Sequence, residues 1–255
     1  MSDARVTVTD EGAVRVLTLN RPAKKNAFDV EQAERLWEAI EAADADESVR
    51  VVVVTGAGDH FSAGADVSIF LNMSSLDPAR LERVARLYRP LRACRTPTVA
   101  MLQGHCVGMG VTVLPHFDLV YAADHVTFTT PFVRLGLVLE YGSAHTLSRL
   151  IGLSRAKELI LRAAPLDAST AADWGLVTRV FSADTLRERT MAIAAEIAAH
   201  PPGAVAESKA LLDRGVELGF EQTVEAEDAA LAVRYGSEEN VKAVMAIMER
   251  KQKRG

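Results

Sequence analysis

The sequence is poor in the features that define several large classes of protein. Its two cysteines, Cys94 and Cys106, lie in apolar stretches and cannot build a disulfide framework, so we expect buried, reduced thiols in a cytoplasmic protein. Lysine and arginine together number 29, against 34 aspartates and glutamates. A protein with this net charge of −5 has no basic surplus with which to neutralise phosphates, which argues against a nucleic-acid partner.

Long apolar runs are also missing. No stretch approaches the length of a transmembrane helix, and residues 1–10 lack the basic-then-apolar order of a signal peptide. We therefore expect no membrane span. The histidines share no metal-ligand spacing with cysteine or acidic pairs, which argues against a zinc site.

The residues that are present have the balance of an ordinary globular protein, with 49% apolar and 25% charged side chains over 255 residues. Apolar alternation at 6–9 and 14–19 predicts a β-hairpin. Asp29 is suited to cap a helix that runs to residue 43, and the apolar run 49–55 predicts a strand buried on both faces.

Short strands and helices then alternate, which predicts an α/β architecture. A strand is expected at 98–102, a short helix at 107–114 and another strand at 118–122. From residue 146 the pattern becomes mostly helical, with the last helices predicted at 183–199, 202–214, 220–234 and 237–251. We divide the chain into a core at 1–195 and a C-terminal helical segment at 196–255, which packs either on that core or on a neighbouring subunit.

Two glycine-rich segments, 56–66 and 104–110, each follow a predicted strand and precede a helical pattern. Neither ends in Gly-Lys-Ser/Thr and neither has the G-x-G-x-x-G spacing, so neither is a phosphate loop or a dinucleotide loop. Each alone is compatible with a simple tight turn. Two such turns in corresponding positions favour a shared ligand, because two N–H groups that converge from two helix starts form an oxyanion hole.

A series of short motifs, taken in order, resembles the enoyl-CoA hydratase/isomerase (crotonase) family, and the resemblance spans essentially the whole chain. The motifs are Asn20-Arg21-Pro22 with Asn26-Ala27-Phe28, Phe61-Ser62-Ala63-Gly64-Ala65-Asp66, Gln103-Gly104 with Gly108-Met109-Gly110, Asp118, Leu135-Gly136-Leu137, Leu150-Ile151-Gly152 and Trp174-Gly175-Leu176-Val177. The resemblance implies a spiral of ββα units with two near-perpendicular sheets. It also implies a helical C-terminal oligomerisation segment that makes homotrimers or hexamers (dimers of trimers).

The resemblance further implies an acyl-CoA substrate, with no bound cofactor and with coenzyme A present only as part of the thioester. Ala65 and Met109 match the two family positions whose backbone N–H groups hold the thioester carbonyl oxygen. Such donors stabilise the negative charge that develops on that oxygen during proton removal or nucleophile addition.

Other matched positions are expected to contact substrate. The segment around Lys24 and Lys25, together with the turn from Ala63 to Asp66, falls where the family binds the nucleotide end of coenzyme A, although the two lysines could equally be solvated loop charges. Asp66 itself is expected to order its own turn. The stretch from Phe70 to residue 88 is expected to cover the acyl chain or to be an ordinary core helix.

The acid–base residues depart from the hydratase pattern. Thr112 and Phe132 stand where hydratases of the family carry their two glutamates, and neither is a useful general base. Glu140, in an apolar run before a predicted helix, resembles the single catalytic carboxylate of enoyl-CoA isomerases, with Leu139 in place of a common proline. Apolar neighbours including residues 137–139, Phe132 and Tyr141 are expected to raise its pKa.

Three hypotheses follow. The leading one is an enoyl-CoA isomerase of fatty acid metabolism, in which Glu140 shuttles a proton from C2 to C4. The second is a hydratase-type lyase that acts without the usual two glutamates. The third is a non-catalytic acyl-CoA-binding or assembly protein that keeps the fold and has lost the hydratase glutamates. For Glu140 itself, the alternative to catalysis is a carboxylate that stabilises the N-terminal end of the following helix.

Overall fold

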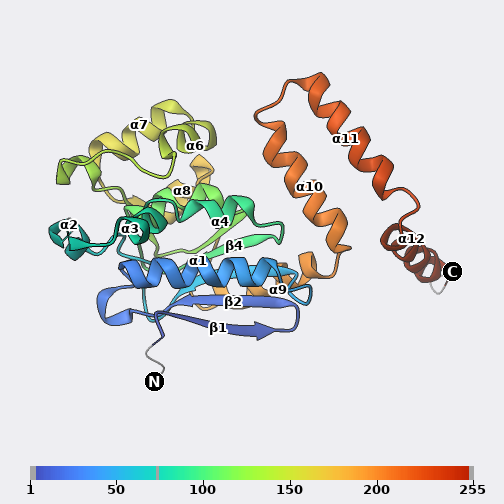
Figure 1. Cartoon of the computed structure of the whole chain (residues 1–255), viewed down its shortest axis with the longest axis horizontal. Coiled ribbons are helices and arrows are strands. Elements are labelled where there is room, and N and C mark those ends of the chain that lie inside the picture. The colour runs from blue at the N-terminus through green and yellow to red at the C-terminus, as the bar shows by residue number, and fades with distance from the viewer. Residues whose placement is uncertain (1–3, 73–74, 253–255) are drawn as a thin grey trace.

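A computed structural model describes residues 4–72 and 75–252 of the chain (Figure 1), and its strands form two β-sheets. The larger sheet has the order β1-β2-β3-β4-β6-β9. Its first two strands, β1 (Val6–Glu11) and β2 (Val14–Leu19), form the predicted antiparallel hairpin around Gly12. The remaining strands are parallel: β3 (Val51–Gly56), β4 (Thr98–Leu102), β6 (Leu119–Ala123) and β9 (Arg179–Phe181).

The apolar character of the central strands follows from how the sheet is covered. Every residue of β3 and β4 is buried, as expected for parallel strands packed on both faces. Helix α1 (Val30–Asp44) contacts β1 and β2, and α9 (Leu186–Ala198) contacts β2, β3, β4, β6 and β9. Asp29 caps α1 as predicted, because its carboxylate accepts a 2.8 Å hydrogen bond from the Gln32 N–H.

The second sheet is small and carries one glycine-rich segment. It consists of β5 (His105–Val107), β7 (Thr127–Thr129) and β8 (Leu166–Asp167). The predicted helix at 107–114 is wrong at its start, because Val107 ends β5 and Gly108 turns the chain at φ +52°. Helix α5 (Met109–Thr112) is therefore a single turn, followed by a 3-10 turn, η3 (Leu114–His116).

Several helices and short turns connect the strands. They are η1 (Pro22–Lys24), α2 (Val67–Asn72), α3 (Pro78–Ala85), α4 (Tyr88–Ala93), η4 (Phe132–Leu135), α6 (Ser143–Leu150), α7 (Leu153–Arg162) and α8 (Ala168–Trp174). Arg80 of α3 makes a double hydrogen bond to Glu34 of α1, at 2.9 and 2.8 Å. This pair fixes α3 against the sheet-covering helix α1.

The last three helices extend away from the sheets (Figure 1). They are α10 (Pro202–Gly215), α11 (Phe220–Arg234) and α12 (Glu238–Gln252). The boundary predicted at 195/196 falls inside α9, which packs on the large sheet, so the segment that leaves the core begins at α10. Neither α10 nor α11 contributes a buried residue, and large apolar side chains such as Leu212 and Phe220 are 75% and 80% exposed.

Candidate active site

The first glycine-rich loop is held in place by Asn26, which is fully buried. Its side-chain amide donates to the carbonyls of Ala57 and His60, at 2.9 and 2.7 Å, and its amide oxygen accepts from the Arg21 N–H. The Ser62 hydroxyl in turn donates to the Asn26 carbonyl and accepts from the Gly64 N–H. These bonds fix the backbone from Gly56 to Gly64 before any ligand binds.

The two glycine-rich loops lie against each other. Ser62 bridges to Cys106 in β5, and the Val107 N–H donates to the Ser62 carbonyl at 2.9 Å. Gly64, at φ +86°, is so close to the second loop that an added Cβ would lie 2.7 Å from the Val107 carbonyl oxygen and 3.6 Å from the Met109 nitrogen. The peptide that carries the Ala65 N–H therefore lies beside the start of α5.

Ala65 and Met109, the two predicted donors, keep their N–H groups unbonded. Within residues 4–72 and 75–252 neither N–H donates a hydrogen bond, although Phe28 pairs with Ala65 through the neighbouring peptides. Met109 is 2% exposed. Because backbone donors usually find a partner when buried, two adjacent free N–H groups mark a place where an acceptor can bind.

Glu140 lies on the turn before α6 and contacts the same region. The Glu140 side chain lies near the Thr112 hydroxyl, at the end of the helix that Met109 begins, and that hydroxyl donates at 3.4 Å to the carbonyls of Gly108 and Met109. Burial raises the pKa of Glu140, and the neighbouring Thr112 hydroxyl opposes that rise. The carboxylate thus lies near the helix that begins at Met109, and its pKa is raised above the usual glutamate value.

The groups that bury Glu140 differ in part from those expected. Phe132 and Tyr141 are 7% and 4% exposed, but Leu137 and Val138 are 38% and 81% exposed, so these last two do not exclude water from the carboxylate. Leu137 and Val138 were predicted to surround Glu140 because they are adjacent to it in sequence, but the extended chain between η4 and α6 turns both side chains outward. Leu139 is partly buried against the core.

The helix-dipole interpretation of Glu140 does not fit the geometry. Helix α6 begins at Ser143 with Gly142 at its N-cap, has no side-chain cap and carries no acidic residue in its first turn. Only the backbone carbonyl of Glu140 bonds to the helix start, through the Ser143 N–H at 2.9 Å. The Glu140 side chain lies near that of Thr112 instead.

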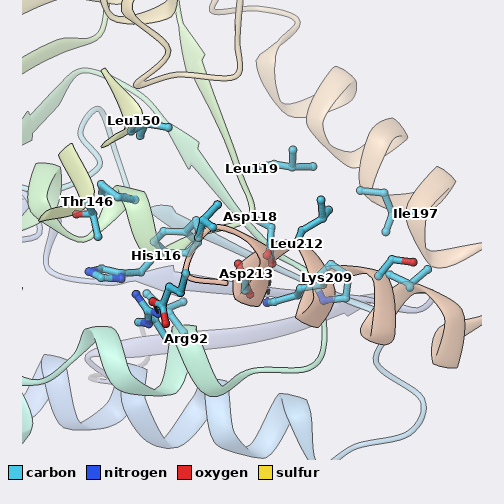
Figure 2. A pocket seen from close by; sticks show the side chains of 18 of the residues that line it. Arg92, His116, Asp118, Leu119, Thr146, Leu150, Ile197, Lys209, Leu212 and Asp213 are labelled. Carbon is cyan, nitrogen blue, oxygen red and sulfur yellow. Dashed lines mark hydrogen bonds and ion pairs between the residues drawn. The ribbon is translucent and has the colours of Figure 1, made fainter. Parts of the chain in front are cut away.

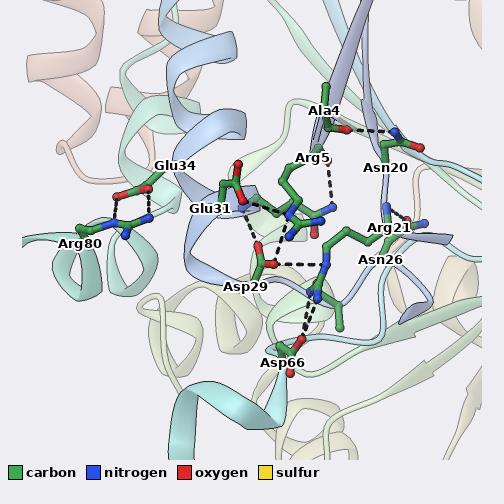
Figure 3. A network of polar contacts seen from close by, with 12 residues as sticks. Ala4, Arg5, Asn20, Arg21, Asn26, Asp29, Glu31, Glu34, Asp66 and Arg80 are labelled. Atoms are coloured by element: carbon green, nitrogen blue, oxygen red, sulfur yellow. Dashed lines mark hydrogen bonds and ion pairs between the residues drawn. The ribbon is translucent and has the colours of Figure 1, made fainter. Parts of the chain in front are cut away.

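The predicted nucleotide-end segments come together. The Ala63 N–H donates to the Lys25 carbonyl at 2.8 Å, and Lys24 and Lys25 are exposed. Asp66 is held by Arg21 through two 3.0 Å hydrogen bonds and accepts from the Ser68 N–H (Figure 3). Although burial raises the pKa of Asp66, the bonds from Ser68 and Arg21 lower it overall. Asp66 therefore orders its own turn, and the ligand role of the two lysines stays a prediction.

The remaining predicted contacts are placed as follows. Thr112 and Phe132 are buried, and the side chain of Phe70 and the residues 73–74 lie outside what the structure describes. Tyr141 is buried, and its hydroxyl donates to the carbonyl of Val84 in α3.

Other side chains singled out by type have structural roles. Cys106 is fully buried and burial raises the pKa of its thiol, which excludes it as a nucleophile. Asp118 accepts from the backbone and hydroxyl of Thr98 and from Lys209 of α10. No cluster of three metal-ligating side chains occurs among the described residues, and no helix among them is long and apolar enough to cross a bilayer.

A groove of about 950 Å³ lies between the core and α10 and is separate from this site (Figure 2). Its walls include His116, Thr146 and Leu150 on the core side, and Lys209 and Leu212 on α10. Glu140, Ala65 and Met109 are not among its lining residues.

Sequence reasoning missed three of the side chains that shape the site. Arg21 and Asn26 lie within motifs that carry the resemblance, so their presence was visible but their partners were not. His116 donates to the Tyr141 carbonyl at 2.9 Å, across 25 positions of sequence. No spacing rule links such residues, because their contact depends on how η3 packs against the Glu140 turn.

The sheets and helices define a mixed α/β protein, and its candidate site combines two free backbone donors with one partly buried carboxylate. That combination suits acid–base chemistry beside a carbonyl oxygen. The chain matches the family profile described as Enoyl-CoA hydratase/isomerase over residues 9–254, and it belongs to that family.

The named relatives include both isomerases and hydratases. The chain is 34% identical to Enoyl-CoA delta isomerase 2 of Rattus norvegicus, over 97% of this chain and 64% of that protein. It therefore spans less than two thirds of that relative. It is 30% identical to the Short-chain-enoyl-CoA hydratase of Clostridium acetobutylicum, over 98% of this chain and 97% of that one. The solved enoyl-CoA hydratase of Bacillus anthracis superposes with a TM-score of 0.90 at 25% identity, covering 96% of both chains.

Proposed function

We propose that the chain isomerises the double bond of an enoyl-CoA thioester, with Glu140 as the single acid–base residue. The observation that carries the proposal is the partly buried Glu140 carboxylate near Thr112, on the helix that begins at Met109, together with the free N–H groups of Ala65 and Met109. Its burial-raised pKa suits a group that must first accept a proton and then return it.

The reaction follows from these groups. With the thioester oxygen on the two N–H donors, Glu140 removes a proton from C2 of a 3-enoyl-CoA, and the electron pair delocalises onto that oxygen as a dienolate. The protonated Glu140 then delivers its proton to C4, and the double bond moves to C2–C3 in conjugation with the thioester. The proton balance closes within one carboxylate and needs no second acid–base residue.

The experiment supplies a 3-enoyl-CoA and a 2-enoyl-CoA of equal length, with products followed by mass and by conjugation absorbance. Isomer formation that falls about 100-fold to 10,000-fold in Glu140→Gln supports the proposal, since this is the usual contribution of a positioned acid–base group. Water addition to the 2-enoyl-CoA, unaffected by Glu140→Gln, would replace the isomerase with a hydratase. Acyl-CoA binding without turnover of either substrate would replace it with a binding protein.

Deuterium adds a second readout. If one carboxylate carries the proton from C2 to C4, product formed in D₂O retains a fraction of the substrate's own C2 hydrogen at C4. Retention of that hydrogen therefore supports a single carboxylate, because two separate groups would deliver only solvent deuterium to C4.

We also propose that α10–α12 pack against further copies of this chain, in a homotrimer or a dimer of trimers in the cytoplasm. The exposed apolar side chains of these helices support this, including Leu212, Val216 and Phe220, which are 66–80% exposed. Light scattering gives the assembly mass directly. Phe220→Glu should lower that mass, whereas a wild-type chain that runs as a monomer would contradict the proposal.

A further inference from the structure

The turn that follows Glu140 has an unusual backbone. Tyr141 has φ +56° and Gly142 has φ +67°, so two successive residues are left-handed before α6 begins. Glycine adopts this conformation without penalty, but a residue with a Cβ does so only where its surroundings hold it there.

The surroundings hold Tyr141 at three points. Its carbonyl oxygen accepts a 2.9 Å hydrogen bond from the His116 Nε2. Its hydroxyl donates to the carbonyl of Val84 in α3. Its ring packs against Tyr88 of α4, with centroids 5.9 Å apart, and Tyr88 also packs on the His116 ring at 5.2 Å.

His116 is suited to this contact. A carbonyl can only accept, so Nε2 carries the hydrogen and the ring is the Nε2–H tautomer. The side chain is 7% exposed, and burial lowers its pKa, so it remains a neutral donor. Within the described residues its Nδ1 has no partner, so the contact to Tyr141 is the one hydrogen bond that orients the ring.

We propose that Tyr141 is a positioning residue for Glu140, clamped by His116 and Val84 so that the adjacent carboxylate stays beside Thr112. The inference rests on the proposed function. It goes beyond the choice of acid–base residue, because it names what fixes the orientation of Glu140 and links that orientation to α3 and α4.

Loosening the clamp has a defined consequence. The charged or titratable groups that act on the clamp are Glu140, which raises the pKa of Tyr141, and Arg92, whose positive charge lowers the pKa of His116. Burial is the main cause of the raised pKa of Glu140, so a turn that opens to water lowers that pKa. The acid limb of kcat/KM, which requires the ionised base, then moves to lower pH.

The first test compares Tyr141→Phe with Tyr121→Phe. The control removes a hydroxyl from another tyrosine that is 4% exposed, on β6, where its ring packs on Phe181. We expect Tyr141→Phe to lower kcat by about 10-fold to 100-fold with KM nearly unchanged, because small misplacement of a catalytic group is costly. Its acid limb should move to lower pH, and Tyr121→Phe should match the wild type in both. Equal kinetics for the two variants would overturn the inference.

A second pair probes the clamp from His116 if Tyr141→Phe folds poorly. His116→Gln keeps an N–H donor, and His116→Leu removes it at similar size, so the glutamine variant should retain more of kcat. Equal loss in both would show that the hydrogen bond has no positioning role.

Double variants separate the two proposals. In Glu140→Gln, whose residual rate is measured at high enzyme concentration, Tyr141→Phe should have no further effect. An undiminished effect there would overturn the positioning role while leaving the function intact. A Glu140→Gln variant with wild-type isomerisation would instead overturn the proposed function.

Discussion

Gly64→Ala tests the paired backbone donors without removing any functional side chain. The added Cβ would lie 2.7 Å from the Val107 carbonyl oxygen, and real Cβ contacts do not fall under 3.0 Å, so one of the two loops must move. The Met109 nitrogen is 3.6 Å from the same point. The displacement therefore falls on the backbone that sets the separation of the Ala65 and Met109 N–H groups.

Gly12→Ala provides a matched control. Gly12 also has positive φ, at +62°, but an added Cβ there has no neighbour within 4 Å, and the residue lies on the β1–β2 hairpin. Both substitutions place alanine in left-handed backbone, which costs about 1–2 kcal/mol of stability in each. The clash with the second loop is specific to Gly64.

The expected fall in kcat of Gly64→Ala follows from the contribution of a single backbone donor. Loss of one oxyanion donor typically lowers kcat by about 100-fold to 1,000-fold. We expect a fall of this order in the isomerisation of a 3-enoyl-CoA by Gly64→Ala, with kcat of Gly12→Ala close to wild type. Thermal melting of both variants and titration with a saturated acyl-CoA check folding and substrate binding. If Gly64→Ala folds and turns over as fast as Gly12→Ala, the assignment of the donors to Ala65 and Met109 is refuted.

Four further outcomes follow from burial and charge. The Thr112 hydroxyl lowers the pKa of Glu140, so Thr112→Val should move the acid limb of kcat/KM to higher pH, and Thr112→Ser should restore it. Because the folded-state pKa of Glu140 is raised, ionising it costs stability as pH rises, so Glu140→Gln should raise the Tm at pH 8 by about 2–4 °C per kcal/mol recovered. His116 has a pKa lowered from 6.5, so its contribution to stability is complete above pH 6.5 and declines as the pH falls; the Tm of wild type should drop more steeply there than that of His116→Gln. Burial raises the pKa of the Cys94 thiol to about 12, and Cys106 is fully buried, so iodoacetamide should modify neither until the chain is unfolded, as mass spectrometry would reveal.

The sequence predicts the large sheet and its helices well, because their signals are local. The hairpin, the Asp29 cap and the buried strand at β3 each depend on residues that are adjacent or one helical turn apart. The helix predicted at 107–114 begins too early for the opposite reason. Its apolar composition suits a helix throughout, but the positive φ of Gly108 and the pairing of β5 with β7 delay its start to Met109.

The sequence singles out Ala65, Met109 and Glu140 because they occupy positions in recognisable motifs, and their roles in the site stay predictions. What holds these residues in place could not be predicted. The Arg21 bonds to Asp66 span 45 positions and the Tyr141 bond to Val84 spans 57, so no pattern in a single sequence indicates them. The same limit explains why Leu137 and Val138 were wrongly placed around Glu140.

The residues at 112 and 140 are linked by electrostatics, which explains why they belong together. A glutamate at 112 would place a second carboxylate near Glu140, and repulsion between the two charges would raise the pKa of one of them. Thr112 has instead a neutral hydroxyl, which lowers the pKa of Glu140 and so favours its ionised form. Phe132 adds burial without charge. Under the proposed function, one carboxylate with a neighbouring hydroxyl and an apolar wall is enough, because a single proton moves on and off Glu140.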